Sequence, residues 1–178
     1  MEKEKKEEKM DMQEVMEVYR KLGTPGDPHK SLAKMAGSWD VRSKFWMEPD
    51  KPPLETTGTS EKKMILEGHF LQQEYTGQMM GNPFTGIGIT GYDNHIKKYV
   101  SIWIDSMDTG IYFFEGTAAA DGKTITQEGR YDDPIKGPMK YRTVIRIVDD
   151  NTMVFEMYGT DKDGKEEKMM EETYTRRK

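Results

Sequence analysis

Four carboxylates lie within segments whose composition predicts β-strands, and a carboxylate that enters a closed interior can act as a general base. They are Glu74, Asp105, Glu115 and Glu156. Burial raises the pKa of a carboxyl group, as acid–base catalysis near neutral pH requires. Most strand carboxylates instead face water, because acids are seldom buried without a partner. The four acids are therefore compatible with acid–base catalysis but do not identify a catalytic residue, and we assign none.

Two arginines, Arg142 and Arg146, share one face of another predicted strand. Inside a closed sheet they would pair with a carboxylate or with the anionic head group of a ligand. The other face of this strand is comparably apolar, so two solvent-exposed arginines are the alternative.

Nothing in the chain has the spacing of metal ligands. His29, His69 and His95 map to one end of the predicted fold, but their spacing matches no known ligand pattern. The absence of cysteine excludes disulfides, a thiolate nucleophile and cysteine-bound zinc. We expect no metal and no cofactor.

The motif Gly86-x-Gly88-x-x-Gly91 has the spacing of a dinucleotide-binding fingerprint. That fingerprint joins a strand to a helix, whereas this one lies within a predicted strand and precedes a turn, so we reject it. We interpret the glycines as permitting curvature or the close approach of a neighbouring chain segment.

Composition limits the partners. The 178 residues carry 33% charged side chains and a net charge of −5, with acids and bases interspersed, which argues against nucleic acid as a partner. The N-terminus lacks the apolar core of a signal peptide, and no run approaches the ~20 apolar residues of a membrane span. We therefore expect a cytoplasmic protein without membrane insertion.

The N-terminal region divides into a charged tail at 1–10 and a helix with its linker at 11–26. The helix, Asp11 to Leu22, has one apolar face that could pack on its own domain, pair with another subunit or cover a pocket. A second, short helix should begin with Asp27 as N-cap and Pro28 in the first position, and end at Gly37.

Residues 27–178 form a single predicted barrel domain. Ten strand candidates follow one another at 38–48, 54–66, 69–79, 84–92, 98–105, 110–119, 123–131, 139–148, 152–160 and 166–175. Short connections pair neighbouring strands antiparallel, and closure removes the exposed edges that an open sheet would leave. We predict an all-β, up-and-down antiparallel barrel of about ten strands, preceded by one or two helices.

Alternate turns of such a barrel lie at the same end. The turns at 48–53, 80–83, 106–109, 132–138 and 161–165 should form the mouth, with the short helix at the opposite, closed floor. Met79, Met80, Met107 and Met139 then gather near the rim, where methionine suits contact with varied apolar ligands or simply fills the core.

Gly37-Ser38-Trp39 after a short helix resembles the start of calycin barrels such as lipocalins, in which the Trp closes the floor. The resemblance implies a structural floor made by Trp39 and an arginine after the last strand, Arg176 or Arg177. Ten strands are also found in fatty-acid-binding proteins and in haem-binding nitrobindins, but the last three strands here lack the histidine that a nitrobindin needs.

A longer pattern is more specific. It comprises Glu74-Tyr75-x-Gly77-x-Met79-Met80-Gly81-x-Pro83-Phe84-x-Gly86-x-Gly88, Gly91-Tyr92-Asp93, Trp103-Ile104-Asp105-Ser106-Met107 and Glu171-x-Thr173-Tyr174-Thr175-Arg176. Together these segments resemble the bacterial domain-of-unknown-function family 1579 (DUF1579) across about residues 28–176. The resemblance implies the fold and carries no activity.

Three functions fit this fold. We expect a binding protein that holds a small, largely apolar molecule in the barrel. The residues we predict to contact it, in the lumen and at the rim, are Tyr75, Met79, Trp103, Asp105, Met107, Arg142 and Tyr158. One alternative is an enzyme with a buried carboxylate as base. The other is an assembly module, such as a homodimer, that uses its outer apolar strands and first helix.

Overall fold

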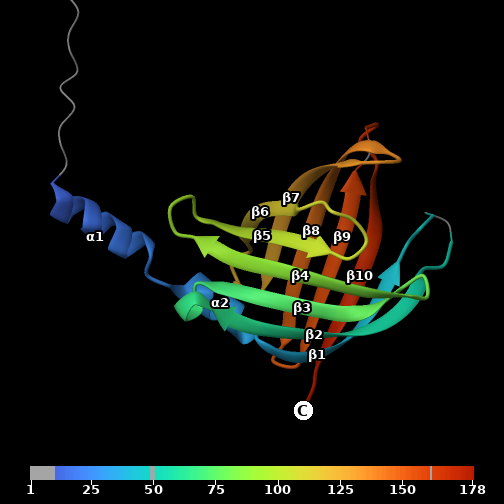
Figure 1. Ribbon diagram of the computed structural model, residues 1–178, viewed down its shortest axis with the longest axis horizontal. Helices are drawn as coiled ribbons and strands as arrows, with labels where there is room; N and C mark the ends of the chain where they lie inside the picture. Colours follow the sequence, from blue (N-terminus) through green and yellow to red (C-terminus); the bar gives the residue numbers. More distant parts are fainter. Residues whose placement is uncertain (1–10, 49–50, 161) are drawn as a thin grey trace, which may run out of the picture.

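A computed structural model describes residues 11–48, 51–160 and 162–178, which form a closed antiparallel barrel preceded by two helices (Figure 1). The strands follow chain order around the barrel, and β1 pairs with β10 to close it. They are β1 Gly37–Phe45, β2 Leu54–Ile65, β3 Phe70–Met79, β4 Asn82–Asp93, β5 Lys98–Asp105, β6 Tyr112–Ala118, β7 Thr124–Asp133, β8 Gly137–Asp149, β9 Thr152–Thr160 and β10 Glu166–Arg176. This confirms the predicted ten-stranded up-and-down barrel. The predicted tail at 1–10, and parts of the turns at 48–53 and 161–165, lie outside the described residues.

Cross-strand register decides which face of each strand lines the lumen. Tyr75 pairs with Gly86, and Gly86 pairs with Asp105. Tyr75 and Tyr99 belong to the buried core, so the row of β5 that includes Tyr99, Trp103 and Asp105 faces inward. Sequence alone left this face undecided, because both sides of the strand are apolar.

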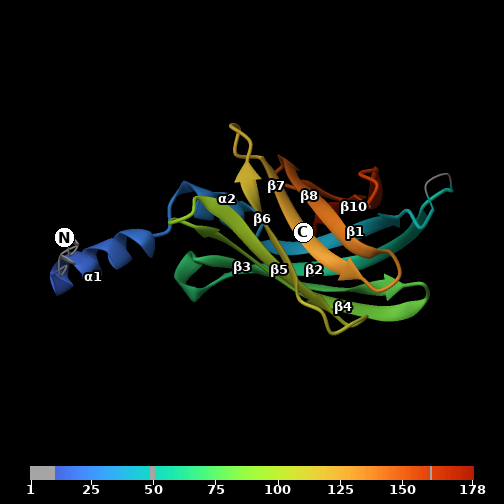
Figure 2. The same ribbon diagram turned by 90° about the horizontal axis from the view of Figure 1, so that it is seen from above.

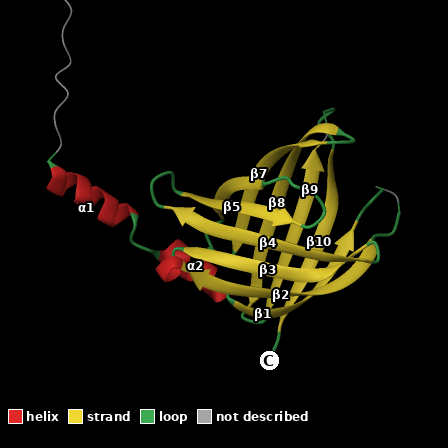
Figure 3. Cartoon of the chain, in the orientation of Figure 1, coloured by secondary structure: helices red, strands yellow, loops and turns green. Residues whose placement is uncertain are grey.

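One end of the barrel is closed by α2 (Asp27–Lys34), which packs against β2, β3 and β4 (Figures 1 and 3). Trp39 is buried there, and its Nε1 donates a hydrogen bond to the Met35 carbonyl at 3.1 Å. The Arg176 guanidinium lies 4.1 Å from the centre of the Trp39 ring. It also donates to the carbonyls of Lys34 (2.9 Å), Ala36 (2.7 Å) and Asp150 (2.7 Å). A single cation thus links α2, the start of β1 and the β8–β9 turn.

The bounds of α2 differ from the prediction. Gly26 rather than Asp27 is the N-cap, because the Gly26 N–H donates to His29 Nδ1 at 3.0 Å. The helix ends at Lys34, before Gly37, because the Met35 and Ala36 amides bond three residues back instead of four.

The first helix, α1 (Met12–Leu22), projects away from the barrel (Figures 1 and 2). Its apolar residues contact nothing that buries them: Met12 is 70% exposed and Tyr19 is 69% exposed. Its C-terminal end is fixed to the floor by Asn94 Nδ2, which donates to the Leu22 carbonyl at 2.7 Å and the Thr24 carbonyl at 3.0 Å. Within the described residues, no helix combines the length and apolar character needed to cross a bilayer.

His69 makes a second connection to the end of α1. Its Nε2 lies 2.7 Å from the Gly23 carbonyl, and its Nδ1 contacts the Leu66 carbonyl. Carbonyl oxygens only accept, so both ring nitrogens donate only when the imidazole is protonated. These two hydrogen bonds accordingly raise the pKa of His69.

Replacing Arg176 with Ala should lower the free energy of unfolding by about 2–4 kcal/mol, because three carbonyls and the Trp39 ring lose their shared partner. Arg177 is the matched control, since it contacts only the exposed carboxylates of Asp40 (3.6 Å) and Glu61 (3.4 Å). Arg177→Ala should change stability by less than about 1 kcal/mol. Urea unfolding of the two variants measures the difference, and equal effects would contradict the closing role of Arg176.

Candidate luminal site

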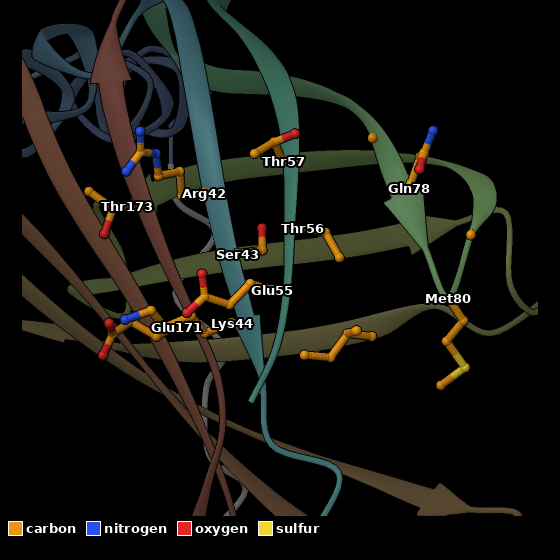
Figure 4. A pocket seen from close by; sticks show the side chains of 13 residues that line it. Arg42, Ser43, Lys44, Glu55, Thr56, Thr57, Gln78, Met80, Glu171 and Thr173 are labelled. Carbon is orange, nitrogen blue, oxygen red and sulfur yellow. The ribbon is translucent and has the colours of Figure 1, made fainter. Parts of the chain in front are cut away.

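The barrel wall opens where β2 and β3 separate. Pairing between these strands ends at Gly58 and Gly77, although β2 begins at Leu54 and β3 continues to Met79. A hollow of about 1110 Å³ lies at this gap (Figure 4). Its lining includes Ser43, which alternation places on the luminal face, and Arg42 on the outer face. The hollow therefore reaches both sides of the wall.

A buried carboxyl group, Glu172 of β10, lies beside Ser43, which lines the hollow. Its Oε1 accepts a hydrogen bond from Ser43 Oγ at 3.0 Å, and its Oε2 accepts one from Tyr174 Oη at 2.5 Å. Burial raises the pKa of Glu172, partly offset by hydrogen bonds from Tyr174 and Ser43 and by the charge of Lys62. Burial and the neighbouring Glu172 raise the pKa of Tyr174, which keeps its phenol protonated as a donor.

Two further polar side chains complete this cluster. Tyr75 Oη lies 3.4 Å from Ser43 Oγ, and Gln73 Nε2 donates to Tyr174 Oη at 3.3 Å. Gly58 and Gly77 make room for the Tyr75 hydroxyl, because a Cβ at either position would come within 2.8 Å of it. We call Ser43, Gln73, Tyr75, Glu172 and Tyr174 the luminal polar cluster.

Lys62 of β2 reaches into the same part of the lumen. Its Nζ lies 4.1 Å from the centre of the Tyr174 ring. Burial lowers the pKa of Lys62 to about 8, and the nearby Glu172 opposes this shift. Burial thus shifts the pKa of Lys62 downward and the pKa of Glu172 upward.

The rest of the inner surface combines aromatic rings with a second polar row, Thr90, Ser101 and Gln127. Trp103 packs against Gly86 and Gly88, where an added Cβ would lie 2.2 Å and 3.2 Å from its ring. Phe84 meets Tyr75 edge to face at 5.7 Å. Packed aromatic rings thus lie beside the luminal polar cluster.

Residues 24–176 match the family described as "Protein of unknown function (DUF1579)". The chain belongs to the DUF1579 family. The match confirms the resemblance found in the sequence, and α1 precedes the matched range. No curated protein sequence matches the chain significantly.

Solved structures similar to this DUF1579 chain are barrels of low sequence identity. S-type phycobiliprotein lyase CPES from Guillardia theta aligns with a TM-score of 0.60 and 11% identity, over 86% of this chain and 94% of that one. A de novo designed fluorescence-activating β-barrel has a TM-score of 0.46 and 14% identity, over 83% and 97%. EF1p2_mFAP2b bound to DFHBI has a TM-score of 0.47 and 14% identity, over 85% and 100%. At such identities the likeness concerns the fold alone.

Five of the residues proposed from the sequence lie in the lumen or at its rim. Tyr75, Trp103 and Asp105 face inward, and Trp103 Nε1 donates to Asp105 Oδ2 at 2.8 Å. Met79 ends β3 beside the gap, and Met107 is 63% exposed in the β5–β6 turn. Met107 contributes its backbone amide, which donates to Asp105 Oδ1 at 2.9 Å.

The other two proposed residues, Arg142 and Tyr158, lie on the outer face of the DUF1579 barrel. Arg142 and Tyr158 pair with each other across β8 and β9. They face outward because the neighbouring pair, Tyr141 and Gly159, faces the lumen. The Arg142 guanidinium binds both carboxylate oxygens of Glu166, at 2.9 and 2.7 Å. This outward pairing satisfies the arginine without a ligand.

Glu156, a candidate base from the sequence, is also on the outer face. Arg146 Nη1 and Lys168 Nζ each approach its carboxylate at 2.5 Å. Burial alone would raise the pKa of Glu156, but these hydrogen bonds outweigh it and lower the pKa to about 2. The group stays ionised and paired, which does not suit a general base.

The remaining candidates from the sequence make surface contacts. Glu74 lies 3.7 Å from Lys63, and Glu115 lies 2.5 Å from Lys98. Among the described residues, no three His, Asp or Glu side chains are arranged to hold a metal ion.

Sequence reasoning missed Glu172, Lys62 and Tyr174. A bulge between Lys168 and Met170 shifts the alternation of β10, so Glu172 and Tyr174 face inward although Lys168, an even number of residues earlier, faces outward. Lys62 stands beside Lys63 in a strand with charges on both faces, and only the register separates the two. A useful signal was Tyr174, which lies two residues after Glu172 and therefore on the same face of the strand.

Replacing Lys62 with Met should remove the part of the free energy of unfolding that rises with pH in the alkaline range. Between pH 8 and 10.5 an unfolded lysine still binds a proton that the folded Lys62 has lost, so this group makes stability rise with pH. The free energy of unfolding of the wild type, relative to Lys62→Met, should increase by about 2 kcal/mol from pH 7 to pH 10.

Urea unfolding across this pH range measures the effect, with Lys63→Met as the matched control on the outer face. The Lys63 variant should follow the wild type. Parallel curves for the wild type and Lys62→Met would show that Lys62 titrates as an exposed lysine.

Proposed function

We propose that this DUF1579 protein binds a small, largely apolar molecule in its barrel and admits it through the gap between β2 and β3. The luminal polar cluster carries the proposal, because its Ser43 lines the hollow at the opening in the wall and packed aromatic rings lie beside it. Ligand sites combine a mainly apolar lining with a few convergent polar groups in this way.

The energetic cost of the cluster supports this function. An ionisable group that is removed from water destabilises the fold unless partners compensate it. Glu172 is 8% exposed, and Lys62 lies close enough for the charge of each group to affect the pKa of the other. An apolar pair at these positions would close the core at lower cost, so the two groups are better explained by binding than by stability.

The similar structures support the fold on which this proposal depends. The lyase from Guillardia theta has the same barrel over most of its length. Function is carried by the residues in a site rather than by the fold, so the luminal residues of this chain carry the proposal.

Native mass spectrometry tests the proposal directly. Protein purified from its own host cells should carry a stoichiometric small molecule that is absent after denaturation. Its release on unfolding would identify the ligand class, and refolded protein should take it up again. Host-purified protein that carries no bound molecule, and takes none up from a host extract, would contradict the binding function.

A second candidate is acid–base catalysis on the bound molecule. Glu172 combines a raised pKa with a hydrogen bond to Tyr174, the arrangement expected of a buried general base with a neighbouring donor. A released molecule whose mass changes on incubation with fresh protein would favour this candidate.

Self-association is a third candidate, and it is favoured by two unpartnered apolar surfaces on one chain. One is α1, and the other is the outer face of β4, β5 and β6, where Ile87, Ile104 and Phe113 are exposed. Two copies could each place α1 on the outer strands of the other, which would cover both surfaces reciprocally.

Mass measurement in solution tests this assembly. The full chain should have twice the mass of one copy, and Met16→Ser with Tyr19→Ser should convert it to single copies because the apolar face of α1 is lost. Gln13→Ser, on the polar face, is the control and should leave the mass unchanged. A dimer that survives the double substitution would remove α1 from the interface.

A further inference from the structure

The luminal face of β2 carries a row of polar side chains with unused donors. Thr56, Ser60 and Lys62 alternate along this face, with Gly58 between the two hydroxyl residues. Thr56 Oγ1 and Ser60 Oγ are buried and have no hydrogen-bond partner among the described residues. Buried hydroxyls normally have partners, so two unpartnered ones in a row point to a missing group.

Lys62 extends this row. Its ammonium group rests on the face of Tyr174, and within the described chain no hydrogen bond or ion pair to its Nζ is formed. A lysine ammonium offers three donors, and contact with a ring uses none of them as a conventional hydrogen bond. Lys62 can therefore donate to a molecule in the lumen.

Glu172, the carboxyl group near Lys62, already accepts hydrogen bonds from other side chains. Both oxygens of Glu172 accept hydrogen bonds, one from Ser43 and one from Tyr174. Burial also raises the pKa of Glu172, which favours its neutral form when a second negative charge is nearby. The cluster thus tolerates an anion beside Lys62.

Access to the row comes from the gap. Thr56 lines the hollow where β2 and β3 separate. At a rise of about 3.3 Å per strand residue, Ser60 follows about 13 Å farther inward and Lys62 about 6.6 Å beyond it. A molecule that enters head first would therefore meet Thr56, then Ser60, then Lys62.

We infer that the bound molecule is an anionic amphiphile whose carboxylate or similar oxyanion accepts hydrogen bonds from Lys62 Nζ and Ser60 Oγ, with its apolar body against the aromatic lining. This inference rests on the proposed binding function and specifies its ligand class. Oxygen acceptors would satisfy the unused donors, and the negative charge would offset the burial of Lys62.

Displacement of a neutral fluorescent probe, N-phenyl-1-naphthylamine, separates the inference from the proposed function. Decanoate and 1-decanol share one alkyl chain and differ in the head group. Decanoate should displace the probe from the wild type at a concentration at least about tenfold lower than decanol, because a hydrogen bond to a charged group contributes about 1.5–3 kcal/mol.

Lys62→Met should abolish this preference, because it removes the charge from a side chain of similar length. Lys63→Met, one residue along and facing outward, should behave as the wild type. Ser60→Ala should weaken displacement of the probe by decanoate about threefold and change displacement by decanol little, because one hydrogen bond from a neutral hydroxyl group is lost.

The outcomes are distinguishable. A wild type that does not bind the probe, decanoate or decanol overturns the proposed function and this inference with it. Probe binding with equal displacement by decanoate and decanol overturns the anionic ligand class and leaves luminal binding in place. A decanoate preference that persists in Lys62→Met, or that Lys63→Met removes instead, overturns the assignment to the β2 row.

Discussion

The pairing of β1 with β10 is the constraint on which the rest of the structure depends. It closes the sheet, and its register sets Trp39 opposite Arg176 and Ser43 opposite Glu172. The first pair forms the floor and the second forms the centre of the luminal polar cluster. A shift of one residue along this seam would exchange inner and outer faces, because side chains alternate along a strand. The floor and the candidate site therefore share one determinant.

Two glutamates on adjacent strands show how strongly the face of the sheet decides chemistry. Glu156 faces outward between Arg146 and Lys168, which hold its pKa far below that of a free carboxyl group. Glu172 faces inward among hydroxyl groups, and burial shifts its pKa the opposite way. The same side chain is thus held ionised by two cations on the outer face of the wall, whereas on the inner face burial favours its protonated form.

Much of the fold could be predicted from sequence, because short turns and strand periodicity leave few ways to pair ten consecutive strands. Tyr75, Trp103 and Asp105 were proposed because apolar or glycine neighbours mark their strands, but only the register of the sheet places them on the inner face. Glu172 could not be placed, because the bulge in β10 reverses the alternation on which such reasoning relies. Lys62 could not be distinguished from Lys63, because consecutive charged residues in β2 give no alternating pattern that marks the inward face. The exposed setting of α1 was equally invisible, since an amphipathic pattern does not state what the apolar face contacts.

The separation of β2 from β3 leaves a short unpaired edge on each of these two strands. From Leu54 to Thr57 the backbone of β2 is paired with β1 on one side and has no β3 partner on the other. Unpaired strand edges invite pairing with other chains, which leads to aggregation. Here Pro53 precedes the edge, and Glu55 adds a charge to it. The chain thus keeps an opening in its wall while the residues around that opening oppose strand addition by another molecule.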